Sequence, residues 1–170
     1  MVNAAAATSP RIARAWDVLE TVLDPEVPAL TLVDLGVVRD VRLAGDTLEV
    51  DLTPTYTGCP ATAAIALDAT TALERAGLGP VKIVTVNSPA WTTDWIGPAA
   101  REKLRAYGIA PPIGRAPAGK RALFANDPDP ACPRCASPRV EKTSAFGSTA
   151  CKALYRCLAC REPFEYFKCI

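Results

Sequence analysis

Apolar residues recur at helical spacing along three stretches of the first 108 residues, and helix-start or helix-stop residues bound these stretches. Ser9 and Pro10 have the chemistry of an N-cap and a first helical position, while Gly77 and Gly108 suit helix C-termini. The pattern therefore predicts three helices, over residues 10–23, 61–76 and 98–107.

Three shorter stretches have the composition of strands. Leu48, Val50 and Leu52 alternate with polar residues, as in a strand that is buried on one face. Residues 37–43 precede this strand across an Ala-Gly-Asp turn, which predicts a hairpin. With a third strand over 81–86, the element order α-β-β-α-β-α predicts an α+β fold in which helices pack on a small mixed sheet.

Charge and proline divide the chain into two predicted modules. Residues 1–108 hold 9 basic and 13 acidic side chains, whereas residues 109–170 hold 10 basic and 5 acidic ones. Prolines are dense between the modules and block both helix and central strand, so residues 109–129 are predicted to be a linker. We expect an α/β domain over 1–108 and a small second domain over 130–170.

The second module contains two Cys-x-x-Cys pairs separated by 21 residues. Such pairs let two tight turns direct four thiolates at one ion, which predicts a zinc ribbon. A module of about 40 residues buries too little apolar surface to fold alone, so one structural zinc ion is expected to stabilise it. An iron–sulfur cluster on the same sulfurs is the alternative. The predicted metal ligands are Cys132, Cys135, Cys157 and Cys160.

Two further cysteines of this module lie outside the paired motif. Cys151 follows a run of small residues and is either an incidental thiol or an additional ligand or client contact. Cys169 lies one residue from the end of the sequence, and the same alternatives apply to it.

The first module offers one cysteine and two tryptophans as candidate functional residues. Cys59 lies between the second strand and the alanine-rich helix, and with Pro60 as the first helical residue it would be the N-cap. A helix N-terminus favours a thiolate, so Cys59 is either a capping residue or a reactive thiol. Trp91 and Trp95 either cover an edge of the core or form a partner-binding anchor.

Composition excludes several classes of function. The sequence has no histidine, which excludes Ser-His-Asp and Cys-His catalysis and histidine-ligated zinc. A net charge of +1 argues against a positive electrostatic field over the whole protein that would attract nucleic acid. Residues 1–10 lack the features of a secretory signal, and no apolar stretch is long enough to cross a membrane. We therefore expect a cytoplasmic protein with reduced thiols.

Several motifs resemble known families. Residues 24–28, 33–38 and 53–60 resemble the MIP18-like domain of iron–sulfur assembly proteins. Residues 91–96, 108–112 and 146–157 narrow the resemblance to the family of the D component of bacterial phenylacetyl-CoA epoxidase, a multicomponent oxygenase of aerobic phenylacetate breakdown.

The resemblance implies an accessory role without a catalytic site. Such a protein would assist assembly of an iron–sulfur cluster or a di-iron centre, and its partners would be the iron–sulfur reductase and di-iron oxygenase components. The Gly-Cys-Pro cysteine, here Cys59, is linked to cluster handling in this domain class and would carry a cluster transiently. Asp34 is expected only to cap a turn. The alternatives are a scaffold protein of the complex that uses Trp91, Trp95 and the ribbon surface, a nucleic-acid-binding ribbon, and a redox protein.

Overall fold

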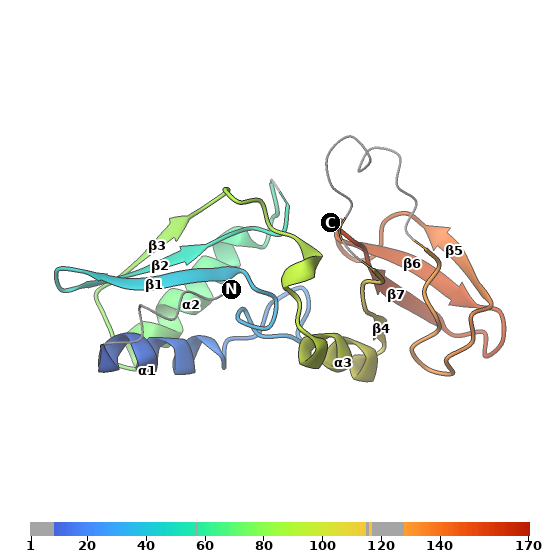
Figure 1. Ribbon diagram of the computed structural model, residues 1–170, viewed down its shortest axis with the longest axis horizontal. Helices are drawn as coiled ribbons and strands as arrows, with labels where there is room; N and C mark the ends of the chain where they lie inside the picture. Colours follow the sequence, from blue (N-terminus) through green and yellow to red (C-terminus); the bar gives the residue numbers. More distant parts are fainter. Residues whose placement is uncertain (1–8, 57, 115, 117–127) are drawn as a thin grey trace. The chain divides into compact units, whose positions relative to one another are not determined.

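The computed structural model describes residues 9–56, 58–114, 116 and 128–170, and it forms two compact units (Figure 1). The first unit is Met1–Trp91 and the second is Thr92–Ile170. This division falls earlier than the predicted boundary at residue 108, because segment 92–110 belongs to the second unit. Residues 117–127 of the predicted linker lie outside the described residues.

The first unit is a three-stranded sheet with two helices on one face (Figure 1). Strands β1 (Val38–Ala44) and β2 (Thr47–Leu52) pair antiparallel, and β3 (Val81–Thr85) lies parallel to β2. Helix α2 (Thr62–Arg75) makes the crossover that a parallel pair requires. With α1 (Pro10–Leu19) beside α2, the predicted mixed sheet with helices is confirmed.

Apolar and polar residues alternate along β2, and the apolar ones contribute to the core of the first unit. Leu48, Val50 and Leu52 are buried, and they share an interior with Leu19 and Leu73 of the two helices. The intervening polar residues of β2 lie on the opposite face of the sheet.

The first helix ends four residues earlier than predicted, at Leu19. Beyond it, Leu23 forms an isolated antiparallel bridge with Thr31, and the Asp24 N–H donates to the Leu30 carbonyl. This non-local pairing satisfies the backbone hydrogen-bonding groups of an extended segment. The helix therefore ends at Leu19, although apolar residues continue at helical spacing beyond it.

The second unit contains a four-stranded sheet in the order β4-β7-β6-β5. The 3-10 helix η1 (Thr93–Trp95) and α3 (Pro98–Tyr107) precede it, and α3 ends as predicted at Gly108, which has a left-handed φ of 100°. Its strands are β4 (Ile109–Ala110), β5 (Val140–Ser144), β6 (Lys152–Cys157) and β7 (Pro163–Phe167).

Strand β4 lies inside the segment that was predicted to be a linker. Ile109 and Ala110 pair parallel with Glu165 and Tyr166 of β7. Ala110 is buried in the same core cluster as Tyr155 and Tyr166, so it gains core contacts in addition to its backbone pairing. Within the described residues, no helix is long and apolar enough to cross a membrane.

A charge network lies on the polar face of the β1–β2–β3 sheet. Glu49 accepts from Lys82 Nζ at 2.7 Å and from Arg42 Nη2 at 2.8 Å, and Arg42 Nη1 lies 2.7 Å from Asp51 Oδ2. The hydrogen bonds from Lys82 and then from Arg42 hold the pKa of Glu49 below its usual value. The charged form of Glu49 is therefore favoured by the folded state.

Glu49→Gln is expected to destabilise the first unit at pH 7. Because the folded pKa is lowered, the contribution is present above the unfolded carboxyl pKa of about 4.3 and is lost as pH falls through the folded pKa. The difference between wild type and variant should shrink below about pH 4. Hydrogen exchange of the β2 amides checks this, with Glu20→Gln on the exposed end of α1 as the control. An unchanged difference between pH 7 and pH 3 would contradict it.

Candidate functional site

Four cysteine sulfurs converge at one end of the β5–β6–β7 ribbon. All four Sγ atoms lie within 4.8 Å of one another, and they belong to the residues predicted as ligands: Cys132, Cys135, Cys157 and Cys160. Cys132 Sγ is 3.7 Å from Cys160 Sγ, and Cys135 Sγ is 3.6 Å from Cys157 Sγ. Each short contact joins one turn to the other, so neither turn forms the site alone.

The two turns that carry these sulfurs have the same backbone design. The N–H of the first cysteine donates to the carbonyl five residues later, from Cys132 to Ser137 and from Cys157 to Glu162. The residue after the second cysteine is left-handed in both turns, with φ of 58° at Ala136 and 65° at Arg161. Non-glycine residues seldom adopt this conformation, which costs free energy that the rest of the turn must offset.

The sulfurs do not ionise equally. The N–H of Cys160, ahead of smaller causes, lowers the pKa of Cys157 to about 6. The N–H of Glu162 acts to lower the pKa of Cys160, but burial and the neighbouring sulfurs outweigh it and raise that pKa to about 12. One thiolate thus forms readily, and further negative charge in the cluster is opposed by repulsion.

This arrangement fits a tetrahedral zinc ion. Zn–S bonds of about 2.3 Å place tetrahedral sulfurs about 3.8 Å apart, close to the two measured contacts. The buried pair Cys132 and Cys157 and the exposed pair Cys135 and Cys160 would all hold the ion. A divalent cation would offset the repulsion between thiolates, and four filled positions suit a structural role.

The other two ribbon cysteines lie outside the cluster. Cys151 is 4% exposed, and its Sγ lies 3.0 Å from the Thr149 hydroxyl. The Cys169 Sγ donates to the Ile113 carbonyl at 3.0 Å. Neither sulfur belongs to the four-sulfur group that the described residues form.

Cys59 lies in a turn before α2, and the prediction that it is the N-cap is wrong. The helix begins at Thr62 with Ala61 as its N-cap. The Cys59 carbonyl accepts both the N–H and the hydroxyl of Thr62, at 3.2 and 2.9 Å, so an extra turn separates the thiol from the helix. Cys59 is half-buried, and the Cys59 N–H donates to the Tyr56 carbonyl.

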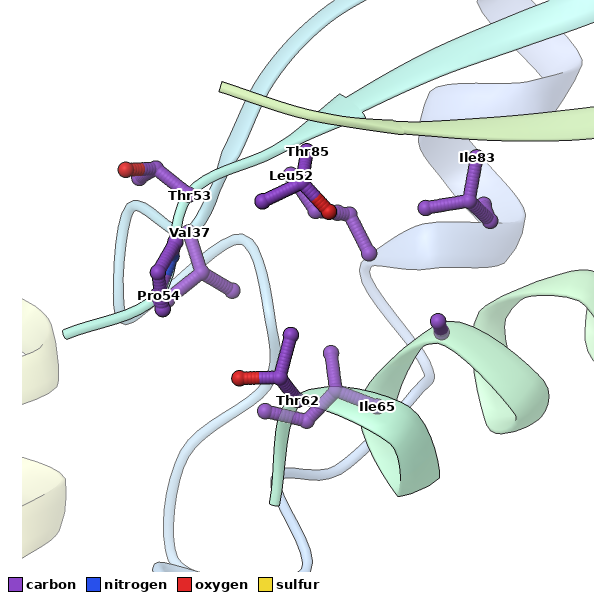
Figure 2. Close-up of a pocket in the computed structure, with 9 residues that line it drawn as sticks. Val37, Leu52, Thr53, Pro54, Thr62, Ile65, Ile83 and Thr85 are labelled. Carbon is purple, nitrogen blue, oxygen red and sulfur yellow. The ribbon is translucent and has the colours of Figure 1, made fainter. Parts of the chain in front are cut away.

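Residues on either side of the turn that carries Cys59 line a small apolar pocket. Thr53 and Pro54 lead into the turn, Thr62 follows it, and all three line the pocket. Figure 2 shows Thr62 and Ile65 of α2 facing the strand residues across the space. The enclosed space is about 20 Å³, far smaller than the usual volume of a ligand site. The full lining is Val37, Leu52, Thr53, Pro54, Thr62, Ile65, Ala66, Ile83 and Thr85.

The two tryptophans lie in different environments and in different units. Trp91 is 5% exposed, and its indole N–H donates to the Leu35 carbonyl at 2.9 Å. Its side chain therefore belongs to the core of the first unit, which corrects its place among the partner-contact candidates. Trp95 ends η1 in the second unit and is half-buried.

The acidic residues of the resembling motifs organise turns. The Asp34 carboxylate accepts the Thr31 N–H at 3.1 Å, and the Thr31 hydroxyl accepts the Asp34 N–H at 3.0 Å. The buried Asp24 carboxylate accepts the N–H groups of Glu26 and Val27. Asp34 thus caps its turn as expected, and Asp24 is a structural residue that the sequence pattern did not single out.

Comparison with known proteins finds two family models and solved structures that resemble this chain. Residues 12–87 match the model of the family described as "Iron-sulfur cluster assembly protein", and residues 116–168 match the "PaaD zinc beta ribbon domain". A crystal structure of a DUF59 domain from Bacillus anthracis has a TM-score of 0.51 and 26% identity, covering 55% of this chain and 91% of that one. A conserved hypothetical protein of Thermotoga maritima has a TM-score of 0.45 and 30% identity, covering 53% and 89%.

The fold and the four-cysteine centre define a class, an iron–sulfur assembly-type α+β unit followed by a zinc ribbon. The chain is 48% identical over 171 residues, and over 100% of both chains, to a protein of Escherichia coli (strain K12) that is named as the putative D component of 1,2-phenylacetyl-CoA epoxidase. It therefore belongs to the family of this epoxidase D component.

Cys132→Ser is expected to reduce zinc from about one ion per chain to a small fraction and to unfold the ribbon, because metal binding and folding are coupled in such modules. Cys151→Ser is the matched control, since its sulfur is buried in the same unit but lies outside the cluster. Metal analysis of anaerobically purified protein, with a visible spectrum, gives the result. Iron with visible absorption at the wild-type site would contradict the zinc assignment.

Proposed function

We propose that this protein is a non-catalytic accessory component of a phenylacetyl-CoA epoxidase system. In this proposal it assists the assembly of an iron–sulfur cluster, or of a di-iron centre, in the reductase or oxygenase component. Cys59 binds the iron or cluster in transit, while the ribbon holds zinc structurally and docks the partner.

The observation that carries the proposal is the combination of two units in one chain. An iron–sulfur assembly-type unit presents a half-buried thiol, and a ribbon with four converging sulfurs follows it. The full-length relative, which is named as part of an epoxidase, supports partners among the oxygenase components.

The surroundings of Cys59 suit a thiol that binds transiently. The backbone around it is fixed by bonds to Tyr56 and Thr62, but no described residue forms a hydrogen bond to its Sγ. Gly58, with φ of 84°, has open space where a side chain would lie. The backbone is fixed, and the open space at Gly58 leaves room beside the turn for an inorganic group.

Cys59→Ser is expected to lower the iron and sulfide content of the client roughly tenfold or more, as when a metal-site ligand set is disturbed. The fold should be retained, because the bonds around Cys59 use backbone atoms. The readout is iron and sulfide in the reductase and oxygenase components, purified from a strain with only the variant. Cys151→Ser is the control, and wild-type metal content with Cys59→Ser would refute the transfer role.

The second candidate is a scaffold protein of the complex that handles no metal. The half-buried Trp95 on η1 favours this alternative as a contact residue. Under the scaffold role, Trp95→Ala should reduce complex assembly, measured by size-exclusion chromatography, while Cys59→Ser leaves both assembly and client metal unchanged. Under the transfer role, Cys59→Ser lowers client metal although the complex still forms.

A further inference from the structure

The first part of the connection between β5 and β6, residues 145–149, displays an aromatic side chain to solvent. We name this segment the Phe146 loop. Phe146 is 65% exposed, whereas Tyr155, Phe164 and Tyr166 of the same unit are buried in its core. The register of β5 with β6 places this connection at the end of the ribbon opposite to the four cysteines, since Val140 pairs with Cys157 and Ser144 with Leu154.

A buried ion pair holds this loop. Lys152 Nζ lies 2.9 Å from Glu165 Oε2, and the Lys152 side chain is 3% exposed. The other carboxylate oxygen, Oε1, accepts the Ser148 N–H at 2.6 Å. Burial acts to raise the pKa of Glu165, but the Ser148 N–H and Lys152 outweigh it and lower that pKa. The charged carboxylate therefore connects a buried lysine to the backbone of the loop.

Further contacts leave the loop little freedom. The Gly147 N–H donates to the Lys152 carbonyl at 2.8 Å, and a Cβ at Gly147 would lie only 2.6 Å from Glu165 Oε1. Lys168 Nζ donates to the Ala145 carbonyl at 3.2 Å and lies 4.7 Å from the centroid of the Phe146 ring. The backbone before and after Phe146 is thus fixed, and a cation covers part of the ring.

A buried lysine carries a desolvation cost even when it is paired, and its effect here is to fix a loop whose aromatic residue adds little to the core. An aromatic side chain on a fixed backbone loses less conformational entropy on binding, which is a property of interface anchors.

The charges around the loop indicate the chemistry of its partner. The sequence from residue 109 onward holds 10 basic and 5 acidic side chains, and beside the loop itself Lys168 lies against the aromatic ring. A surface with carboxylates around an apolar recess would complement both features.

We propose that the Phe146 loop docks an acidic surface of a partner protein, with the phenyl ring in an apolar recess of that partner. The partner is a component of the oxygenase system, and this part of the inference rests on the proposed function. The contact lies away from the four-cysteine centre, so the ribbon binds metal at one end and a protein at the other.

The test measures binding of the purified reductase and oxygenase components, from the same organism, to the zinc-loaded full-length protein at low and high salt. Phe146→Ala should weaken binding at least about tenfold, as for an interface anchor, whereas Phe146→Leu keeps a large apolar side chain for the recess and should bind more tightly than Phe146→Ala. Tyr107→Ala is the matched control, because Tyr107 is an aromatic residue of the same unit and is 55% exposed. Binding should also weaken with salt.

Glu165→Gln tests the positioning of the loop separately. It removes the charge that holds Lys152 and Ser148 but leaves Phe146 unchanged. Faster hydrogen exchange of the Ser148 amide together with weaker binding supports the inference, provided that zinc content and circular dichroism show a folded ribbon.

The outcomes separate the two proposals. If wild type binds a component and Phe146→Ala binds equally well, the docking inference is wrong while the proposed function stands. If wild type binds neither component, the proposed function fails and the docking inference fails with it. If Phe146 is instead needed for binding a single-stranded oligonucleotide, and not for either component, the assignment to a protein partner is overturned.

Discussion

Repulsion among four sulfurs is the constraint on which the second unit depends. Sulfurs within 4.8 Å of one another cannot all carry charge without a cation, and the opposite pKa shifts of Cys157 and Cys160 express this. A divalent ion removes the conflict and joins two turns that are distant in sequence. The small aromatic core around Tyr155 and Tyr166 lies on strands whose ends such an ion would hold. A bound ion and the core would then stabilise the unit cooperatively.

The two ends of the ribbon differ in what fixes their loops. At one end, left-handed residues after Cys135 and Cys160 shape the turns that gather sulfur. At the other end, a buried pair of Lys152 and Glu165 shapes a loop that exposes an aromatic ring. Both ends use a charged group to hold backbone that the small hydrophobic core does not reach. In the first unit, by contrast, the sheet and helices bury an apolar interior, and Cys59 lies in a turn at the entry to α2.

Much of the fold follows from local chemistry. The alternation of Leu48, Val50 and Leu52 and the left-handed Gly108 were enough to predict β2 and the end of α3. The predictions were wrong where pairing with a segment distant in sequence overrides the local preference for a helix or a linker. Leu23 bridges Thr31 instead of extending α1, and Ile109–Ala110 joins β7 instead of a linker. Pro60 was also misleading, because its φ suits a turn before the helix as well as the first helical residue.

The amino-acid sequence by itself indicated two modules, the four cysteines whose sulfurs converge and the isolated thiol at Cys59, because residue type and spacing encode sulfur chemistry directly. The tertiary structure alone decided which cysteines stay out of the cluster, that Trp91 is a core residue, and that Glu165 holds the Phe146 loop. Burial and pairing arise between segments far apart in the chain. The local sequence pattern cannot predict this burial and pairing, because the free energy of burying a charge or a ring depends on which groups the fold places beside it.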